Sequence, residues 1–199
     1  MSSPHCQSSG GNADKFVYRV HNSWHRERVG QIIKSSHPLV GNTPTSLTLW
    51  IKPTDQFNPP NFSNLQVYHL SGSTFTNLAS VPTITGSNFV ETEFTLSNCP
   101  TIQANDEIGI RAVGATGSSS SYGLSIEMSN SNPENYSNIV ESHDSGVNEY
   151  SSYDLKYCVA YSTGSGGSGG SGGSEGSVDL TADGAVIDHV FYLNTVVPK

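Results

Sequence analysis

Short runs of alternating apolar and polar residues fill most of this chain, and this alternation constrains its fold more than any other feature. In the run NFVETEFTL at 88–96, Val90 and Phe94 share one side of an extended chain and the glutamates share the other. A period of two predicts β-strands with one buried face. Turns rich in Gly, Pro, Asn and Ser separate the runs, and no ten-residue segment has a helical period. Strands are therefore predicted at 15–21, 28–35, 46–52, 64–70, 74–81, 88–96, 107–113, 122–128, 138–141 and 153–161.

The number and spacing of these strands predict an all-β fold, an antiparallel β-sandwich of jelly-roll or Greek-key type. Residues 1–14 are polar, and we expect them to form a flexible N-terminal segment ahead of a sandwich domain at 15–163. Trp50, inside the run SLTLWIK, is predicted to lie in the core of that domain.

A Gly/Ser repeat, GSGGSGGSGGSEGS, occupies residues 164–177 and holds eight of the chain's 20 glycines. Its regularity indicates an engineered linker rather than part of a folded domain. A flexible linker of this length spans about 20 Å. The linker therefore joins the sandwich to the segment 178–199, and it is long enough to cross one end of a small domain.

The segment 178–199 after the linker contains AVIDHVFYLNTVV at 185–197, the strongest strand signal in the chain. Both faces of this strand are apolar, so we expect it to be buried within a sheet. The linker then serves to deliver it into the same domain, which completes the sandwich. The residues predicted to anchor the strand are Val186, Ile187, Val190, Phe191, Tyr192, Leu193, Val196 and Val197.

Three origins account for such a tethered strand. It is a donor strand that natively pairs with the next copy of the protein in a polymer, or the first strand of a circularly permuted monomer, or a foreign peptide ligand. In the first two cases, 178–199 natively precedes Ser2. We favour the donor strand, because strand addition supplies backbone hydrogen bonds together with alternate side-chain anchors.

The runs RVGQIIKSS, SLTLWIKPT, NDEIGIRAV and YDLKYCVAY resemble those of jelly-roll, concanavalin-like sandwich modules in secreted archaeal and viral surface proteins. The tethered strand resembles the donor strands of extracellular filament and pilus subunits. These resemblances imply an extracellular or cell-surface structural protein that assembles or adheres through copies of itself.

Composition excludes several classes of partner. Lys and Arg number 9 against 17 Asp and Glu, for a net charge of −8. A chain without a basic cluster is a poor ligand for a phosphate backbone, so nucleic acid is not an expected partner. The chain also contains no apolar run of 18 residues, so no membrane span is predicted. It shows no signal peptide either.

Catalytic signatures are weak. Glu91 and Glu93 share a strand face, as the acids of some glycosidases do, but the run lacks a third acid. His21 and His25 are four residues apart without the HExxH pattern of a zinc helix. No GxSxG or phosphate-binding loop occurs. We therefore expect a protein that is not an enzyme.

Two kinds of ligand remain candidates. Calcium would bind the acidic loop at 141–154, through Asp144, Glu149 and Asp154, and no other cofactor is expected. Carbohydrate binding is the alternative function, and its loop-borne aromatic residues are Trp24, Tyr136 and Tyr150.

Three cysteines allow at most one disulfide within a monomer. They are Cys6, Cys99 and Cys158, and none is part of a C-x-x-C motif. The pair that we favour is Cys99 with Cys158.

Overall fold

The computed structural model describes residues 4–7, 13–20, 23–53, 62, 64–113, 122–129, 137–143 and 146–163. These residues contain twelve β-strands and no helix, which confirms the predicted all-β class. The strands are β1 His5–Gln7, β2 Ala13–Val20, β3 Ser23–Ile33, β4 Asn42–Pro53, β5 Leu65–Ser71, β6 Thr74–Ser80, β7 Val90–Thr95, β8 Glu107–Ala112, β9 Tyr122–Met128, β10 Ser137–His143, β11 Gly146–Tyr150 and β12 Tyr157–Thr163. The predicted linker and terminal strand lie outside the described residues.

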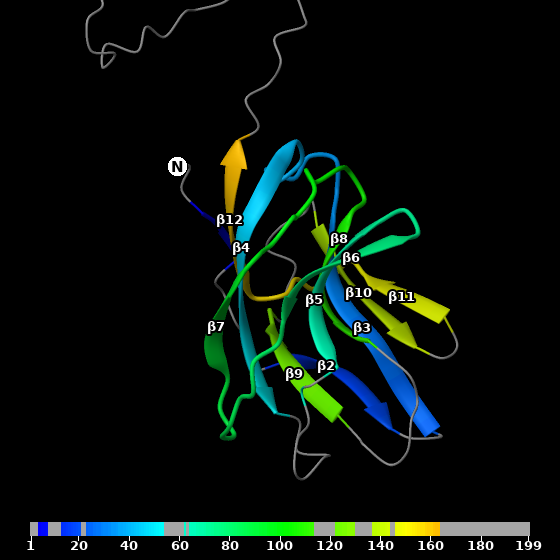
Figure 1. The fold of residues 1–199 in the computed structure, drawn as a ribbon. Helices are drawn as coiled ribbons and strands as arrows, with labels where there is room; N and C mark the ends of the chain where they lie inside the picture. Colours follow the sequence, from blue (N-terminus) through cyan, green and yellow to red (C-terminus); the bar gives the residue numbers. More distant parts are fainter. Residues whose placement is uncertain are drawn as a thin grey trace, which may run out of the picture. The chain divides into compact units, whose positions relative to one another are not determined.

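The strands form two antiparallel layers, as predicted for a sandwich (Figure 1). One layer has the order β6-β5-β8-β3-β10-β11, and the other has β1-β12-β4-β9-β2 with β7 on the opposite edge of β4. The start of β3 also pairs with β2, so β3 connects the two layers. The jelly-roll wiring stays a prediction.

β4 shows how the sequence pattern builds the sandwich. Leu47, Leu49 and Ile51 are buried, whereas the residues between them are half-buried on the opposite face. The buried residues face Val29 and Ile110 of the other layer across a shared core. A strand with a single buried face alternates in this way because successive side chains point to opposite sides of a sheet.

Three details differ from the sequence expectation. β1 lies inside the segment predicted to be flexible, and β11 lies in a stretch predicted to be mostly loop. Trp50 is not a core residue. It lies half-buried on the outer face of β4, with the Nζ atom of Lys156 4.4 Å from the centre of its ring. β4 places Trp50 opposite to its buried neighbours Leu49 and Ile51.

Candidate functional site

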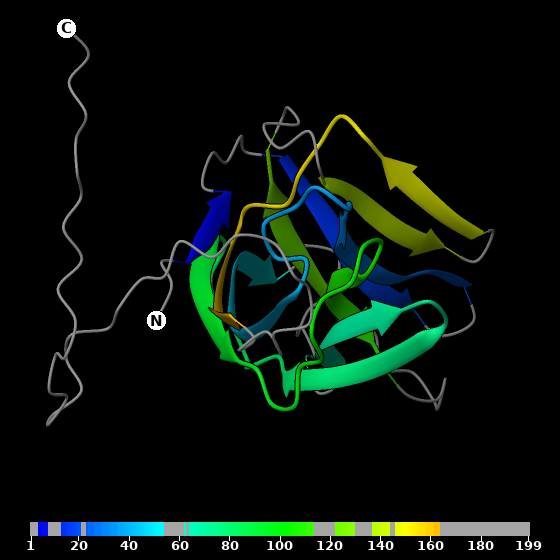
Figure 2. The same cartoon turned by 90° about the horizontal axis from the view of Figure 1, so that it is seen from above.

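β1 is held on the outer edge of β12 by both backbone and covalent bonds. Cys6 is aligned with Cys158 in the antiparallel register, and the two form a disulfide. The predicted Cys99–Cys158 pair is therefore wrong. The correct pair could have been found only by predicting β1, which carries Cys6. The three residues of β1 show no alternation of apolar and polar residues that would predict a strand. Figure 2 shows β1, in dark blue, beside β12, in orange, at the edge of the domain.

Cys99 is a buried free thiol. Burial, followed by the negative charge of Asp106, raises the pKa of Cys99 to about 12. The thiol is therefore protonated at neutral pH, and the thiolate is the form that acts as a nucleophile. Cys99 is accordingly a core residue rather than a reactive group.

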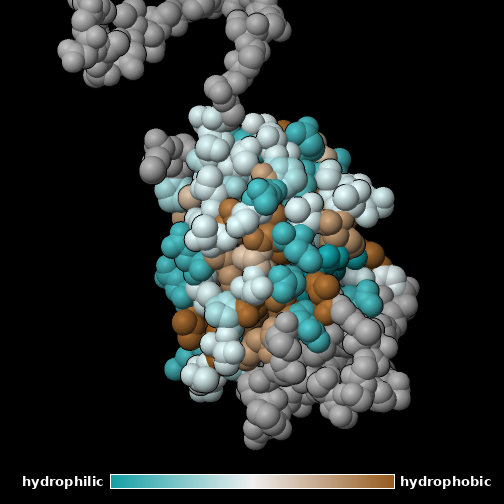
Figure 3. Space-filling view, viewed as in Figure 1, coloured by the Kyte–Doolittle hydropathy of each residue, from teal (hydrophilic) through white to brown (hydrophobic). Residues whose placement is uncertain are grey.

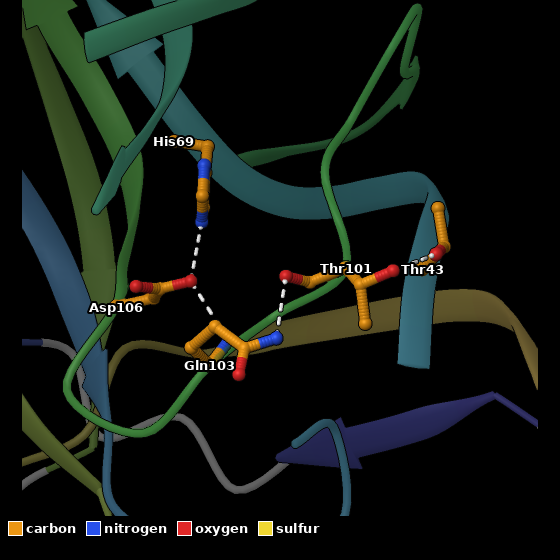
Figure 4. Close-up of polar contacts among 5 residues, drawn as sticks. All are labelled: Thr43, His69, Thr101, Gln103 and Asp106. Atoms are coloured by element: carbon orange, nitrogen blue, oxygen red, sulfur yellow. Dashed lines mark hydrogen bonds and ion pairs between the residues drawn. The ribbon is translucent and has the colours of Figure 1, made fainter. Parts of the chain in front are cut away.

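Beside Cys99, a buried polar pair joins β5 to the loop that precedes β8 (Figure 4). The carboxylate of Asp106 accepts hydrogen bonds from Nε2 of His69, at 2.7 Å, and from the backbone amide of Gln103, at 2.8 Å. Nδ1 of His69 is buried and has no hydrogen-bond partner. The side chains of His69 and Asp106 are only 2% and 3% exposed, so this pair fixes the loop and is closed to a substrate.

The core is incompletely covered along β7. On its inner face, Phe94 is buried beside Leu47, but Val90, which is aligned with the fully buried Ile51, is 43% exposed. Among the described strands, β7 pairs only with β4, and no described strand pairs with its other edge. Figure 3 shows hydrophobic surface, in brown, in the middle of this side of the molecule and beside β7. Within the described residues, the hydrophobic inner face is thus only partly covered at the start of β7.

The predicted calcium ligands are not brought together as a metal site in the described part of the chain. Glu149 accepts a hydrogen bond from Lys34 at 2.6 Å and another from Asn138. Asp154 is fully buried and accepts from Gln31 at 2.6 Å. No group of three His, Cys, Asp or Glu suited to a metal occurs among the described residues, which exclude Asp144. Calcium binding stays a prediction.

The predicted sugar-binding aromatics are only partly placed. Tyr150 ends β11, packs against the core, and donates a hydrogen bond to Oε1 of Glu141 at 2.5 Å. Its ring is thus engaged within the domain. Trp24 lies on β3, but its side chain is not among the described parts of the structure. Tyr136 lies wholly outside the described residues. Glu91 and Glu93 are exposed on the outer face of β7.

A second polar cluster, which the sequence analysis missed, lies on the outer face of the β5-β8-β3 layer. Nε of Arg28 lies 3.0 Å from Oε1 of Glu107, a carboxyl group that is only 5% exposed. Burial raises the pKa of Glu107 to about 7, although the charge of Arg28 and its hydrogen bond act in the opposite direction. The only signal in the sequence was an acid within the strand EIGIRA.

The raised pKa makes stability depend on pH. Between its ordinary value near 4.5 and about 7, Glu107 is protonated when folded and ionised when unfolded. Stability should therefore fall as pH rises through this window, by up to about 1.4 kcal/mol per pH unit. Glutamine cannot ionise, so Glu107→Gln should escape this loss. The free energy of unfolding of Glu107→Gln minus that of the parent should therefore be about 2 kcal/mol larger at pH 8 than at pH 5. Urea unfolding at the two pH values measures the difference.

Glu149 provides the matched control for that experiment. Its pKa is lowered, chiefly by the hydrogen bonds from Lys34 and Asn138. Its contribution to stability is therefore present above its ordinary pKa and is lost as pH falls toward the lowered value. The difference in free energy of unfolding between Glu149→Gln and the parent should therefore be the same at pH 5 and at pH 8. Parallel pH profiles of Glu107→Gln and the parent would contradict the assignment.

Comparison with protein-family models, curated proteins and solved structures finds no match to this chain. The described residues also contain no helix that is long and apolar enough to cross a membrane.

Proposed function

We propose that this protein is a non-catalytic, extracellular structural subunit that assembles by donor-strand complementation, and that the tethered form complements itself. The observation that carries the proposal is the open edge of β7, where the inner-face residue Val90 is 43% exposed. A strand that is apolar on both faces, as 185–197 is, suits this position. Covering a large apolar side chain contributes about 1.5–3 kcal/mol.

The length of the linker agrees with this acceptor edge. β12 ends at Thr163 beside Asn42, and β7 ends at Thr95 beside Ser46 of the same strand β4. A strand on the far edge of β7 would lie three strand spacings from β12. It would start four residues further along β4 than the end of β12 does. Together these two displacements place its start about 20 Å from the end of β12. The linker at 164–177 spans about that distance when flexible. The strand would then run antiparallel to β7.

The position of β1 explains how the same strand would reach a neighbour in the untethered order. β1 is antiparallel to β12, with His5 beside Val159 and Gln7 beside Tyr157. From Gln7 back to His5, β1 therefore runs toward the end of β12 at Thr163. If 178–199 natively precedes Ser2, the donor strand leaves its own domain at this end. It is then free to pair with the edge of β7 in the next subunit. The Cys6–Cys158 disulfide would meanwhile hold β1, which follows the donor strand, on β12 of its own domain.

The test uses the two exposed valines of the full tethered chain, which lie on different edge strands. Val90 is on β7, and Val147, which is 56% exposed, is on β11. We expect Val90→Asp to lower the melting temperature by several degrees, because an inserted strand would bury its carboxylate. Val147→Asp should change the melting temperature by less than about 2 °C, as expected for a surface substitution. Differential scanning calorimetry makes the comparison.

Two outcomes would contradict the proposal. One is equal melting temperatures for the two valine variants. The other is a strictly monomeric protein when 178–199 is moved ahead of Ser2 without the linker, which would favour a permuted monomer. A donor strand instead predicts concentration-dependent polymers of that rearranged chain, visible by electron microscopy. Carbohydrate binding has weaker support, because the Tyr150 hydroxyl is bound to Glu141.

A further inference from the structure

The Cys6–Cys158 disulfide lies on the outer, solvent-facing side of β12 rather than in the core. On β12, the neighbours Tyr157 and Val159 are buried in the core, and successive side chains of a strand point to opposite faces. Cys158 is accordingly half-buried on the outer face, and its partner Cys6 is exposed. A thiol from solution can therefore reach the disulfide in the folded domain. Exposed disulfides are ordinarily the ones that are readily reduced.

The strand β1 depends on this disulfide more than its neighbour β12 does. β1 has three residues at the edge of the domain, and among the described strands it pairs only with β12 (Figure 2). Gln7 is buried, and the ring of His5 packs against that of His37 with 4.7 Å between centroids. By contrast, all seven residues of β12 are aligned with β4 on its other edge. Short edge strands open locally at low cost, so loss of the disulfide should release β1 and leave β12 in place.

The third cysteine of the chain does not compete for this bond. Cys99 is a buried free thiol, and its raised pKa of about 12 leaves little thiolate at neutral pH. The thiolate is the form that attacks a disulfide, so exchange with Cys99 is suppressed in the folded protein. Because the chain contains three cysteines in all, Cys6 and Cys158 have only each other as partners within the folded domain. The bond therefore has two states, formed and reduced.

We propose that the Cys6–Cys158 disulfide is a redox latch, which holds β1 on β12 when formed and releases β1 from a folded domain when reduced. One thiolate of a dithiol in solution attacks Sγ of Cys6, the exposed sulfur, and the electrons of the S–S bond leave with Sγ of Cys158. The second thiolate of the dithiol then displaces Sγ of Cys6, and the dithiol becomes a cyclic disulfide. Two electrons pass to the protein, and each cysteine sulfur takes up a proton.

Release of β1 changes the edge of the sheet. In the oxidised domain, β1 pairs with residues 157–159 of β12. In the reduced domain, the backbone groups of β12 that face β1 are left unpaired, and an unpaired strand edge is a template for pairing with another strand. The latch thus converts a covered edge into an uncovered one. It does not depend on donor-strand complementation, because its test leaves β7 and 178–199 unchanged.

The experiment compares amide hydrogen exchange of the full tethered chain with and without dithiothreitol, at neutral pH and without denaturant. Peptides that contain residues 5–7 should exchange about tenfold faster after reduction, whereas peptides from β3 and β8 should keep their protection. Oxidised glutathione, added after the reductant is removed, should restore the slow exchange. Cys99→Ala should respond as the parent does. Cys6→Ser should exchange rapidly at residues 5–7 with or without the reductant.

The rate of reduction tests whether the disulfide is reached in the folded state. Alkylation at timed intervals, followed by mass spectrometry, should give a rate that does not change with low concentrations of urea. A rate that increases with urea as unfolding does would show that the bond is reduced only after unfolding, contrary to a latch. Unchanged exchange at residues 5–7 after reduction, or rapid exchange throughout β3 and β8, would also overturn the proposal.

Discussion

Replacing Cys6 and Cys158 together by serine is expected to lower the free energy of unfolding by about 3–5 kcal/mol. The disulfide joins residues 152 positions apart, so it restrains almost the whole described domain in the unfolded state. On the chain-entropy account, a loop of this length corresponds to about 5 kcal/mol. Guanidinium unfolding of the parent and of the double variant measures the loss.

Reduction gives this prediction a matched control. Dithiothreitol should destabilise the parent to the level of the double serine variant and should leave that variant unchanged. Cys99→Ala should keep the full response to the reductant, because Cys99 is a free thiol. A parent protein whose unfolding midpoint is the same with and without reductant would show that the disulfide does not contribute as expected.

The sequence predicted β4, which has one buried face, and missed β11, which has none. β4 alternates buried and half-buried residues over much of its length, so its pattern was visible. β11, by contrast, has four exposed residues followed by one that is half-buried. A strand with no buried face has no period for a pattern to detect. The missed β1 had a further consequence, because the correct disulfide partner of Cys158 lies on it.

The polar cluster was missed for a different physical reason. Within EIGIRA, Ile108 and Ile110 lie in the core. Because side chains alternate along a strand, Glu107 and Arg111 are directed to the outer face, where charged residues are ordinarily solvated. Glu107 is nevertheless buried, because Tyr68 and Arg28 meet it across a pair of glycines on two different strands. Such a convergence depends on strand register, which alternation alone does not determine.

The glycine pair itself should be highly sensitive to substitution. A Cβ atom at Gly109 would lie 2.2 Å from the carbonyl oxygen of Val29 and 2.4 Å from the Cα atom of Gly30. Both contacts are with the backbone of β3, so relief requires the central β3–β8 pairing to shift. We expect Gly109→Ala to cost about 3 kcal/mol or more, at the upper end of overpacking effects, or to prevent soluble expression. Urea unfolding or the soluble yield provides the measurement.

Gly30→Ala is the informative comparison, because its clashes are with side chains. The added methyl group meets the Tyr68 hydroxyl and the Glu107 side chain, which can rotate away, so about 1–2 kcal/mol is expected. Tyr68→Phe removes the nearest contacted atom and should recover part of the loss at Gly30 but none of the loss at Gly109. If Tyr68→Phe restored stability equally to both alanine variants, the two losses would have the same cause. That result would contradict the assignment of a side-chain clash to Gly30 and a backbone clash to Gly109.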